Sequence, residues 1–182
     1  LKRLVRSGQM LSVTMEEMPP NSYACLSHGD LHSQNILVTG TVQPTAILID
    51  TAEFGVHHWT TDYGRLIANL IFGAVDAGVQ SYHWKHVATW RAIAGRVCNL
   101  DVLTEAEKDH NLSVKIAINW LINSVAHVCP AFAGKEGPNS RRWELHLGLA
   151  VEFLRVACHS DLGPPKRVAA LLAAHDALVM AE

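Results

Sequence analysis

Three oxygen-bearing side chains lie close together in the first third of the chain, in HGDLHSQNIL (28–37) and AILIDTAEFG (46–55). They are Asp30, Asn35 and Asp50. Carboxylate and amide oxygens are the ligands that hard cations take in proteins. A carboxylate that stays free of metal can instead orient a hydroxyl group and accept its proton. The two segments therefore predict a site where an acid and a bound cation act together.

A short β-hairpin between Asn35 and Asp50 would bring these two side chains together. Two apolar runs, each typical of a strand, flank a segment that contains Gly, Thr and Pro. The register that we expect pairs Val38 with Ile47, and so places Asn35 opposite Asp50. Directly opposite residues of an antiparallel pair lie about 4.5–5.5 Å apart. We therefore expect Asn35 and Asp50 to bind one cation between them.

The segment His28-Gly-Asp30, followed by Asn35 and by an apolar-flanked Asp50, resembles the catalytic segment of the aminoglycoside phosphotransferase and choline-kinase-like branch of the protein kinase fold. In protein kinases the catalytic-loop Asp accepts the proton of the substrate hydroxyl, and an Asn and a second Asp bind magnesium. The resemblance implies that Asp30 is the catalytic base and that Asn35 and Asp50 are the metal ligands. It also implies Mg²⁺ and ATP, or another nucleoside triphosphate, as cofactors and a small-molecule hydroxyl compound as acceptor.

The resemblance extends over residues 28–66, roughly a fifth of the chain. Within it, Asp62 of TTDYGRL matches the aspartate that opens the next helix and braces the catalytic loop. Two positions depart from the family pattern. Thr51 stands where these phosphotransferases usually carry an aromatic residue, so a packing contact is missing. Glu53 is a candidate to support the metal ligands or to bind a second metal ion.

Histidines stand on both sides of Asp30. We expect His28 to brace the loop and His32 to line the wall of the site, and both are candidates for cofactor binding. A metal-dependent hydrolase built on His28, Asp30 and His32 is a further hypothesis, because these three potential metal ligands stand at alternate positions of HGDLH. Zinc sites need three or four nitrogen or sulfur ligands, and no second cluster of this kind follows nearby. We expect His57 and His58 to be a solvated loop pair.

Composition indicates one domain with a real core: the chain has 182 residues, of which 49% are hydrophobic. The formal charge of −2 implies no general attraction to nucleic acid or to a membrane surface. No apolar run reaches the ~18–20 residues of a membrane span, and no signal peptide is apparent. The four cysteines have no metal-binding spacing and are expected to be reduced core thiols of a cytoplasmic protein: Cys25, Cys98, Cys129 and Cys158.

The expected fold class is α+β and mostly α-helical, with the hairpin carrying the catalytic and metal-binding segments. We expect a helix and loop over 1–27, the catalytic loop, hairpin and metal-binding segment over 28–55, and a helical bundle over 60–182. Apolar residues and caps predict helices over about 60–75, 84–97 and 104–128, a loop over 131–140, a helix through 145–154 and a last helix after 163–165. Stripes of Leu, Ile and Trp, among them Ile116, Trp120 and Leu171, are expected to be core positions.

A complete kinase-like enzyme also has an amino-terminal β-rich lobe, with a phosphate-covering loop and a lysine that binds the phosphates. Residues 1–27 contain neither pattern. We therefore expect the chain to be the carboxy-terminal lobe of a longer protein, inactive alone, with the missing lobe as its partner. The leading hypothesis is a phosphotransferase that acts on a small-molecule hydroxyl. The alternative is a kinase-like regulatory or binding module without turnover, which the missing lobe and Thr51 favour.

Overall fold

Five helices and two small antiparallel sheets make up the part of the chain that the computed structural model describes, residues 24–40, 42–73, 83–104, 112–128 and 142–182. The strands are β1 (Ala24–Ser27), β2 (Ile36–Thr39), β3 (Thr45–Leu48) and β4 (Gly55–His58). The helices are α2 (Thr60–Phe72), α3 (Val87–Cys98), α4 (Leu112–Val128), α6 (Arg142–Cys158) and α7 (Pro164–Ala181). Short 3₁₀ turns are η1 (Ser33–Asn35), η2 (Thr51–Glu53) and η3 (Trp84–His86). The predicted α+β, mostly α-helical class is confirmed.

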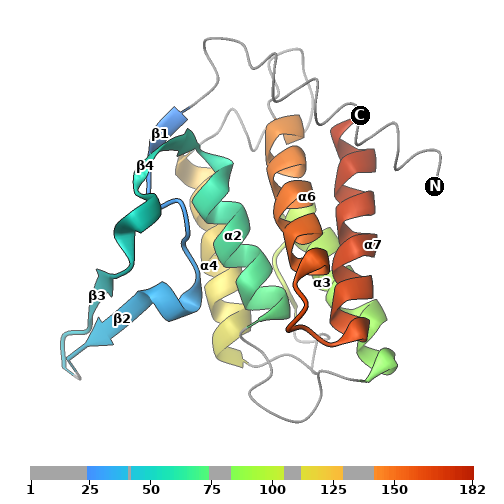
Figure 1. Ribbon diagram of the computed structural model, residues 1–182, viewed down its shortest axis with the longest axis horizontal. Coiled ribbons are helices and arrows are strands. Elements are labelled where there is room, and N and C mark those ends of the chain that lie inside the picture. The colour runs from blue at the N-terminus through green and yellow to red at the C-terminus, as the bar shows by residue number, and fades with distance from the viewer. Residues whose placement is uncertain (1–23, 41, 74–82, 105–111, 129–141) are drawn as a thin grey trace.

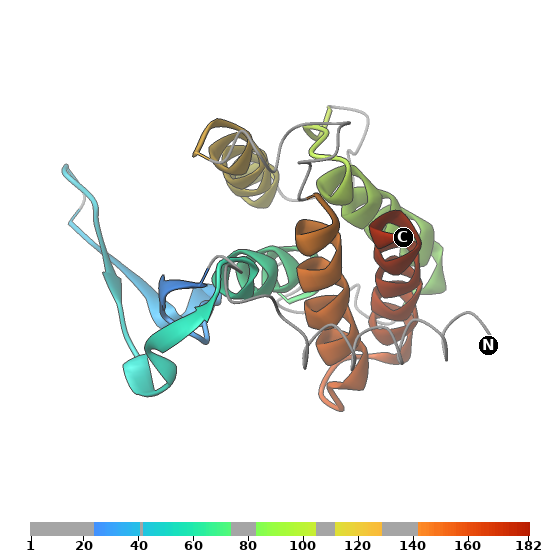
Figure 2. The ribbon, with the colours of Figure 1, turned by 90° about the horizontal axis from the view of Figure 1, so that it is seen from above.

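The helices form a bundle, and the strands lie beside α2 on the side away from α6 and α7 (Figures 1 and 2). Helix α6 packs against both α2 and α7, and α3 packs against α7. Buried apolar side chains from all five described helices form the core between them. The rings of Phe72 and Phe153 meet edge to face, with their centroids 5.7 Å apart, and join α2 to α6. This packing makes α2 the wall that separates the core from the strands.

The hairpin forms where the sequence predicts it, but its register is one residue away from the expected one. Ile36 pairs with Leu48 and Leu37 with Ile47, so Val38 does not face Ile47. The next residues continue this register, because the Ile49 N–H donates to the carbonyl oxygen of Asn35 at 3.0 Å. Asn35 therefore lies opposite Ile49 and not opposite Asp50. Both hairpin strands are largely exposed, and a strand with no buried face specifies its register weakly.

A second strand pair was not expected. Strand β1 occupies the end of the segment that we assigned to a helix and loop, and it pairs with β4 in the register Ala24 to His58 and Ser27 to Gly55. His57 and His58 are therefore strand residues rather than a solvated loop pair, and both are only partly exposed. The His58 ring contacts the buried Glu144 of α6, with 3.2 Å between Nε2 and Oε2. This contact ties β4 to the bundle.

Two helices bury a different face from the one that the sequence suggested. In α4 the expected core residues Ile116 and Trp120 are exposed, and Ile118 and Ile122 are buried instead. In α7 the expected core residue Leu171 is exposed, while Leu178 is buried as expected, and most core contacts come from the alanines at 169, 170, 173, 174 and 177. Small side chains allow α7 to approach its neighbours closely, because the distance between packed helices depends on the side chains at the contact.

Some predicted features lie outside the described residues: the helix over residues 1–23, the capping box over 105–107 and the loop over 131–140. The other helices agree with the sequence within a few residues. Helix α3 begins at Val87, after the turn η3, rather than at Trp84. Helix α7 begins at Pro164, directly after Gly163, where a proline fits because its missing N–H would have no helical partner. None of the described helices is long and apolar enough to cross a membrane.

The cysteines are not uniformly core residues. Cys25 and Cys158 are exposed free thiols, and Cys98 is a buried free thiol in α3; Cys129 lies outside the described residues. Burial raises the pKa of the Cys98 thiol to about 12, with a smaller contribution from the charge of Asp176. The thiolate is the nucleophilic form of cysteine, so a raised pKa keeps this thiol unreactive.

We expect native protein at pH 8 to be alkylated by iodoacetamide at Cys25 and Cys158 but not at Cys98. At that pH the buried thiol, with a pKa of about 12, is protonated, and reagent cannot reach it. Peptide mass spectrometry after timed labelling, with and without urea, measures this. Labelling of Cys98 in native protein as fast as that of Cys158 would contradict the burial of α3.

Candidate active site

The loop that carries Asp30 is held by hydrogen bonds to the first turn of α2. The Asp62 carboxylate accepts hydrogen bonds from the N–H groups of His28, at 2.6 Å, and Gly29, at 2.9 Å. Gly29 has φ +80°, and a Cβ there would lie 2.9 Å from both the Glu53 Cβ and the His57 Nε2. Only glycine fits this turn without strain. The geometry is the one that the sequence predicts for a brace at Asp62.

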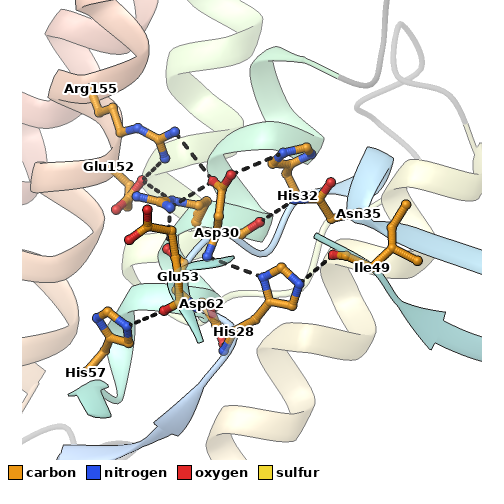
Figure 3. A network of polar contacts seen from close by, with 12 residues as sticks. His28, Asp30, His32, Asn35, Ile49, Glu53, His57, Asp62, Glu152 and Arg155 are labelled. Carbon is orange, nitrogen blue, oxygen red and sulfur yellow. Dashed lines mark hydrogen bonds and ion pairs between the residues drawn. The ribbon is translucent and has the colours of Figure 1, made fainter. Parts of the chain in front are cut away.

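The His28 side chain links the loop to the end of the hairpin (Figure 3). Its Nδ1 accepts a bond from the Asp30 N–H at 3.4 Å, so Nε2 carries the proton and donates to the Ile49 carbonyl oxygen at 2.8 Å. Both ring nitrogens are therefore engaged within the protein, and the ring is buried. This arrangement fits the bracing contact that we expected and leaves no ring nitrogen for a cofactor or a zinc ion.

The same contacts fix the two expected metal ligands relative to Asp30. The Asn35 amide nitrogen donates to the Asp30 carbonyl oxygen at 3.0 Å, which leaves the Asn35 amide oxygen without a partner among the described residues. Ile49 is held at its N–H by Asn35 and at its carbonyl by His28, so the start of the following residue, Asp50, is fixed as well. The Asp50 carboxylate is exposed and has no hydrogen bond or ion pair with the described residues.

Asp50 follows the hydrogen-bonded residues of the hairpin and has a left-handed backbone conformation, with φ 57° and ψ 61°. Non-glycine residues rarely adopt this conformation, and it recurs at functional sites. The turn η2 follows at once and carries Glu53, whose carboxylate also has no partner among the described residues. The Glu53 carbonyl oxygen is bound by the His57 Nε2 at 2.8 Å. Proteins typically supply one or two oxygen ligands to Mg²⁺, which keeps several waters, and Asn35 and Asp50 are the candidates for this share.

Three further charged residues surround the Asp30 carboxylate, and sequence reasoning missed all of them. Arg65 Nη1 lies 2.8 Å from Asp30 Oδ1 and also donates to the Gly29 carbonyl oxygen. Arg155 Nη2 lies 3.6 Å from the same Oδ1. Behind both, the buried Glu152 places Oε2 3.4 Å from Arg65 Nε and 3.3 Å from Arg155 Nη1. Two carboxylates and two guanidinium groups therefore form one cluster.

The remaining oxygen of Asp30 faces His32. The His32 Nε2 lies 3.7 Å from Asp30 Oδ2, beyond hydrogen-bond distance, and the His32 ring is partly exposed. His32 belongs to the wall of a cavity of about 590 Å³, a size typical of sites for small molecules. The cavity wall combines residues after the catalytic loop with residues of α2, of α6 and of the turn between α6 and α7: His32, Ser33, Gln34, Arg65, Ala68, Asn69, Phe72, Gly73, Glu152, Arg155, Val156, His159, Asp161 and Leu162.

The three-residue zinc site considered for His28, Asp30 and His32 does not form. The His28 nitrogens bind other groups, and no group of three or more His, Cys, Asp or Glu side chains suited to a metal ion occurs among the described residues. Asn35 and Asp50 keep side-chain oxygens that no described residue binds. The described residues therefore do not support the zinc hydrolase hypothesis.

Comparison with known proteins agrees with this geometry. The sequence model of the phosphotransferase enzyme family, APH, matches residues 5–96, which is half of the chain. The chain belongs to this family. No curated protein and no solved structure matches the chain. The APH match includes Asp30, Asn35, Asp50 and the brace at Asp62, and it ends before α6, which carries Glu152 and Arg155.

We expect Asp62→Ala to lower the free energy of unfolding by about 2–5 kcal/mol, because two buried N–H groups would lose a charged acceptor. Chemical denaturation of the purified protein measures this value. Asp161→Ala is the matched control, since its exposed carboxylate bonds, among the described residues, only to the neighbouring Ser160. A loss of less than about 0.5 kcal/mol, the usual range for surface changes, would contradict the bracing role.

Proposed function

We propose that this APH-family chain carries the catalytic centre of a phosphotransferase that moves the γ-phosphoryl group of a magnesium-bound nucleoside triphosphate to the hydroxyl of a small molecule. The observation that carries the proposal is the position of Asp30. Its carboxylate lies against Arg65, Arg155 and His32, which line a cavity of small-molecule size. The backbone of its loop is held from both sides. Catalysis of phosphoryl transfer consists mostly of positioning and charge neutralisation, so such a rigid loop suits the reaction.

Asp30 orients the acceptor and takes its proton. Oδ1 is occupied by Arg65, so Oδ2 is the oxygen that receives the hydroxyl of an acceptor in the cavity. The hydrogen bond holds the hydroxyl oxygen toward the phosphate, and its proton passes to the carboxylate as the new bond forms. Arg65 keeps the carboxylate in this orientation, because it binds both the side chain and the Gly29 carbonyl.

Asn35 and Asp50 are the residues that would hold the metal ion. Both offer oxygen atoms that the described residues leave without a partner, and contacts from the loop fix the backbone of both. When bound, the ion would neutralise the negative charge that moves between the phosphate oxygens during transfer. Glu53, exposed three residues after Asp50, is placed to support that ligand or a second ion.

A regulatory module without turnover is the second candidate. The observation that favours it is that guanidinium groups of both Arg65 and Arg155 already lie at the Asp30 carboxylate. In such a module the loop would keep its shape and nucleotide would bind. The arginines would stay bound to the Asp30 carboxylate, so no acceptor hydroxyl could take their place there.

Transfer of label from γ-labelled ATP tests the proposal. The full-length protein is incubated with Mg²⁺ and with polyols, amino sugars, amino alcohols and hydroxy acids, and phosphorylated products are separated by chromatography. We expect a labelled acceptor whose formation stops when Mg²⁺ is chelated. Magnesium-dependent binding of ATP without transfer to any acceptor would instead support the regulatory module.

A further inference from the structure

Glu152 is a buried acid in the middle of α6, and its carboxylate faces the catalytic loop (Figure 3). A buried carboxylate must be paired to be tolerated. Its Oε2 is shared between Arg65 Nε, at 3.4 Å, and Arg155 Nη1, at 3.3 Å. These are the same two guanidinium groups that reach Asp30 Oδ1. Glu152 is therefore the common counter-ion of both cations beside Asp30.

The packing of α2 against α6 is built to let Glu152 reach this position. Gly64 precedes Arg65 in α2, and a Cβ at Gly64 would lie 3.2 Å from the Glu152 Cγ and 3.4 Å from the Gly148 carbonyl oxygen. A larger residue would push the Glu152 side chain away by a few tenths of an ångström. Glycine costs stability in the middle of a helix, so its position here fits a need for close approach.

The two arginines differ in how firmly they are held. Arg65 is 18% exposed and has three partners among the described residues: Glu152, Asp30 and the Gly29 carbonyl oxygen. Arg155 is 42% exposed and lies on the cavity wall, with its Asp30 contact at 3.6 Å. Removing the Glu152 charge would leave two like charges beside one carboxylate. The two guanidinium groups would repel each other, so Arg155 would move away from Arg65 and bind Asp30 Oδ2, the oxygen that the acceptor must reach.

We propose that Glu152 is a positioning residue for Asp30: it binds Arg65 and Arg155 so that Arg65 orients the carboxylate and Arg155 stays off its free oxygen. The inference rests on the proposed phosphotransfer, and it adds a residue from outside the family match. Glu152 touches no reacting atom. It acts on the reaction through the two guanidinium groups that it holds.

Glu152→Gln in the full-length protein tests this, because glutamine keeps the shape and removes the charge. We expect kcat to fall on the order of 10- to 100-fold, with ATP as donor and with either water or an acceptor found in the label-transfer assay as the group that receives the phosphate. The KM for Mg-ATP should stay within about twofold, since the nucleotide site is not touched. Glu144→Gln is the matched control: it neutralises a buried acid of the same helix that contacts Trp59 and His58 instead of the two arginines.

Hydrogen–deuterium exchange separates positioning from mere packing and does not depend on turnover. We expect faster exchange in Glu152→Gln confined to the segment 28–32, with α6 unchanged. Arg65→Lys should produce the same change, and adding Glu152→Gln to it should have little further effect, because one acts through the other. If Glu152→Gln does not fold, Gly64→Ala displaces the same carboxylate and gives the same readouts.

Unchanged exchange of segment 28–32 with unchanged kcat would overturn the proposal for Glu152. Effects of Glu152→Gln and Arg65→Lys that simply add would overturn it as well. A protein that never transfers phosphate, but whose loop loosens in Glu152→Gln, would refute the proposed function and still support the positioning of Asp30.

Discussion

Replacing Asp50 with alanine in the full-length protein should abolish phosphoryl transfer. Of the two proposed metal ligands, Asp50 is the only one with a charge, and the Asn35 amide alone is a weak ligand for a divalent ion. A bound ion contributes several kcal/mol of charge stabilisation in the transition state, so we expect a loss on the order of 10³-fold or more. Initial rates over a Mg²⁺ series measure it, together with the Mg²⁺ concentration for half-maximal activity.

Asp101→Ala is the control for that experiment. Asp101 is also an exposed carboxylate after a left-handed residue, Leu100, but it follows α3 and lies away from the loop. Its replacement should leave both the rate and the Mg²⁺ requirement unchanged. Full activity of Asp50→Ala at ordinary Mg²⁺ concentrations would remove Asp50 from the metal site and leave Glu53 as the nearest exposed acid.

The parts of the site that the sequence predicts are those fixed by short spacings. His28, Asp30 and Asn35 lie within eight residues, and their mutual contacts run through backbone groups whose positions the chain itself constrains. Asp62 was expected at the start of a helix with its carboxylate toward the loop, and it lies there because the N–H groups of a tight loop need an acceptor.

The register of the hairpin could not be predicted because nothing in its sequence selects one pairing. Both strands are apolar on neighbouring positions and mostly exposed, so a slip by one residue costs little burial. The exposed face of α4 shows the same limitation. Its sequence is apolar nearly all round, and periodicity cannot then say which side meets the core.

The arginine and glutamate cluster was missed for a different reason. Glu152 lies 87 residues after Arg65, and only the packing of α6 against α2 brings them together. One signal was available: Asp62 and Arg65 stand three apart and so share a face of α2. Once Asp62 is directed at the loop, Arg65 must face the loop as well. Glu152 and Arg155 repeat that spacing on α6.

Asp30→Asn should lower kcat by about 10²- to 10⁴-fold, the usual contribution of a general base. Asparagine keeps the shape, and its amide oxygen can still accept from Arg65 in place of Oδ1. Its amide nitrogen would then occupy the position of Oδ2, where it cannot take a proton from the acceptor hydroxyl. Mg-ATP binding should persist, because Asn35 and Asp50 are unchanged. Stopped-flow or filter assays of transfer, with calorimetry of nucleotide binding, measure the two effects separately.

The control for Asp30→Asn is Asp176→Asn, which makes the same change in a carboxylate paired with an arginine far from the loop. Asp176 binds Arg91 Nε at 2.6 Å, and this pairing holds the pKa of its carboxyl below the ordinary value. We expect that variant to lose some stability at neutral pH, but its kcat at a temperature where it is folded should match the wild type. If Asp30→Asn kept a kcat within threefold of that control, Asp30 would be a structural member of the loop. The proton acceptor would then have to be sought on the cavity wall, beginning with His32, whose Nε2 lies 3.7 Å from Asp30 Oδ2.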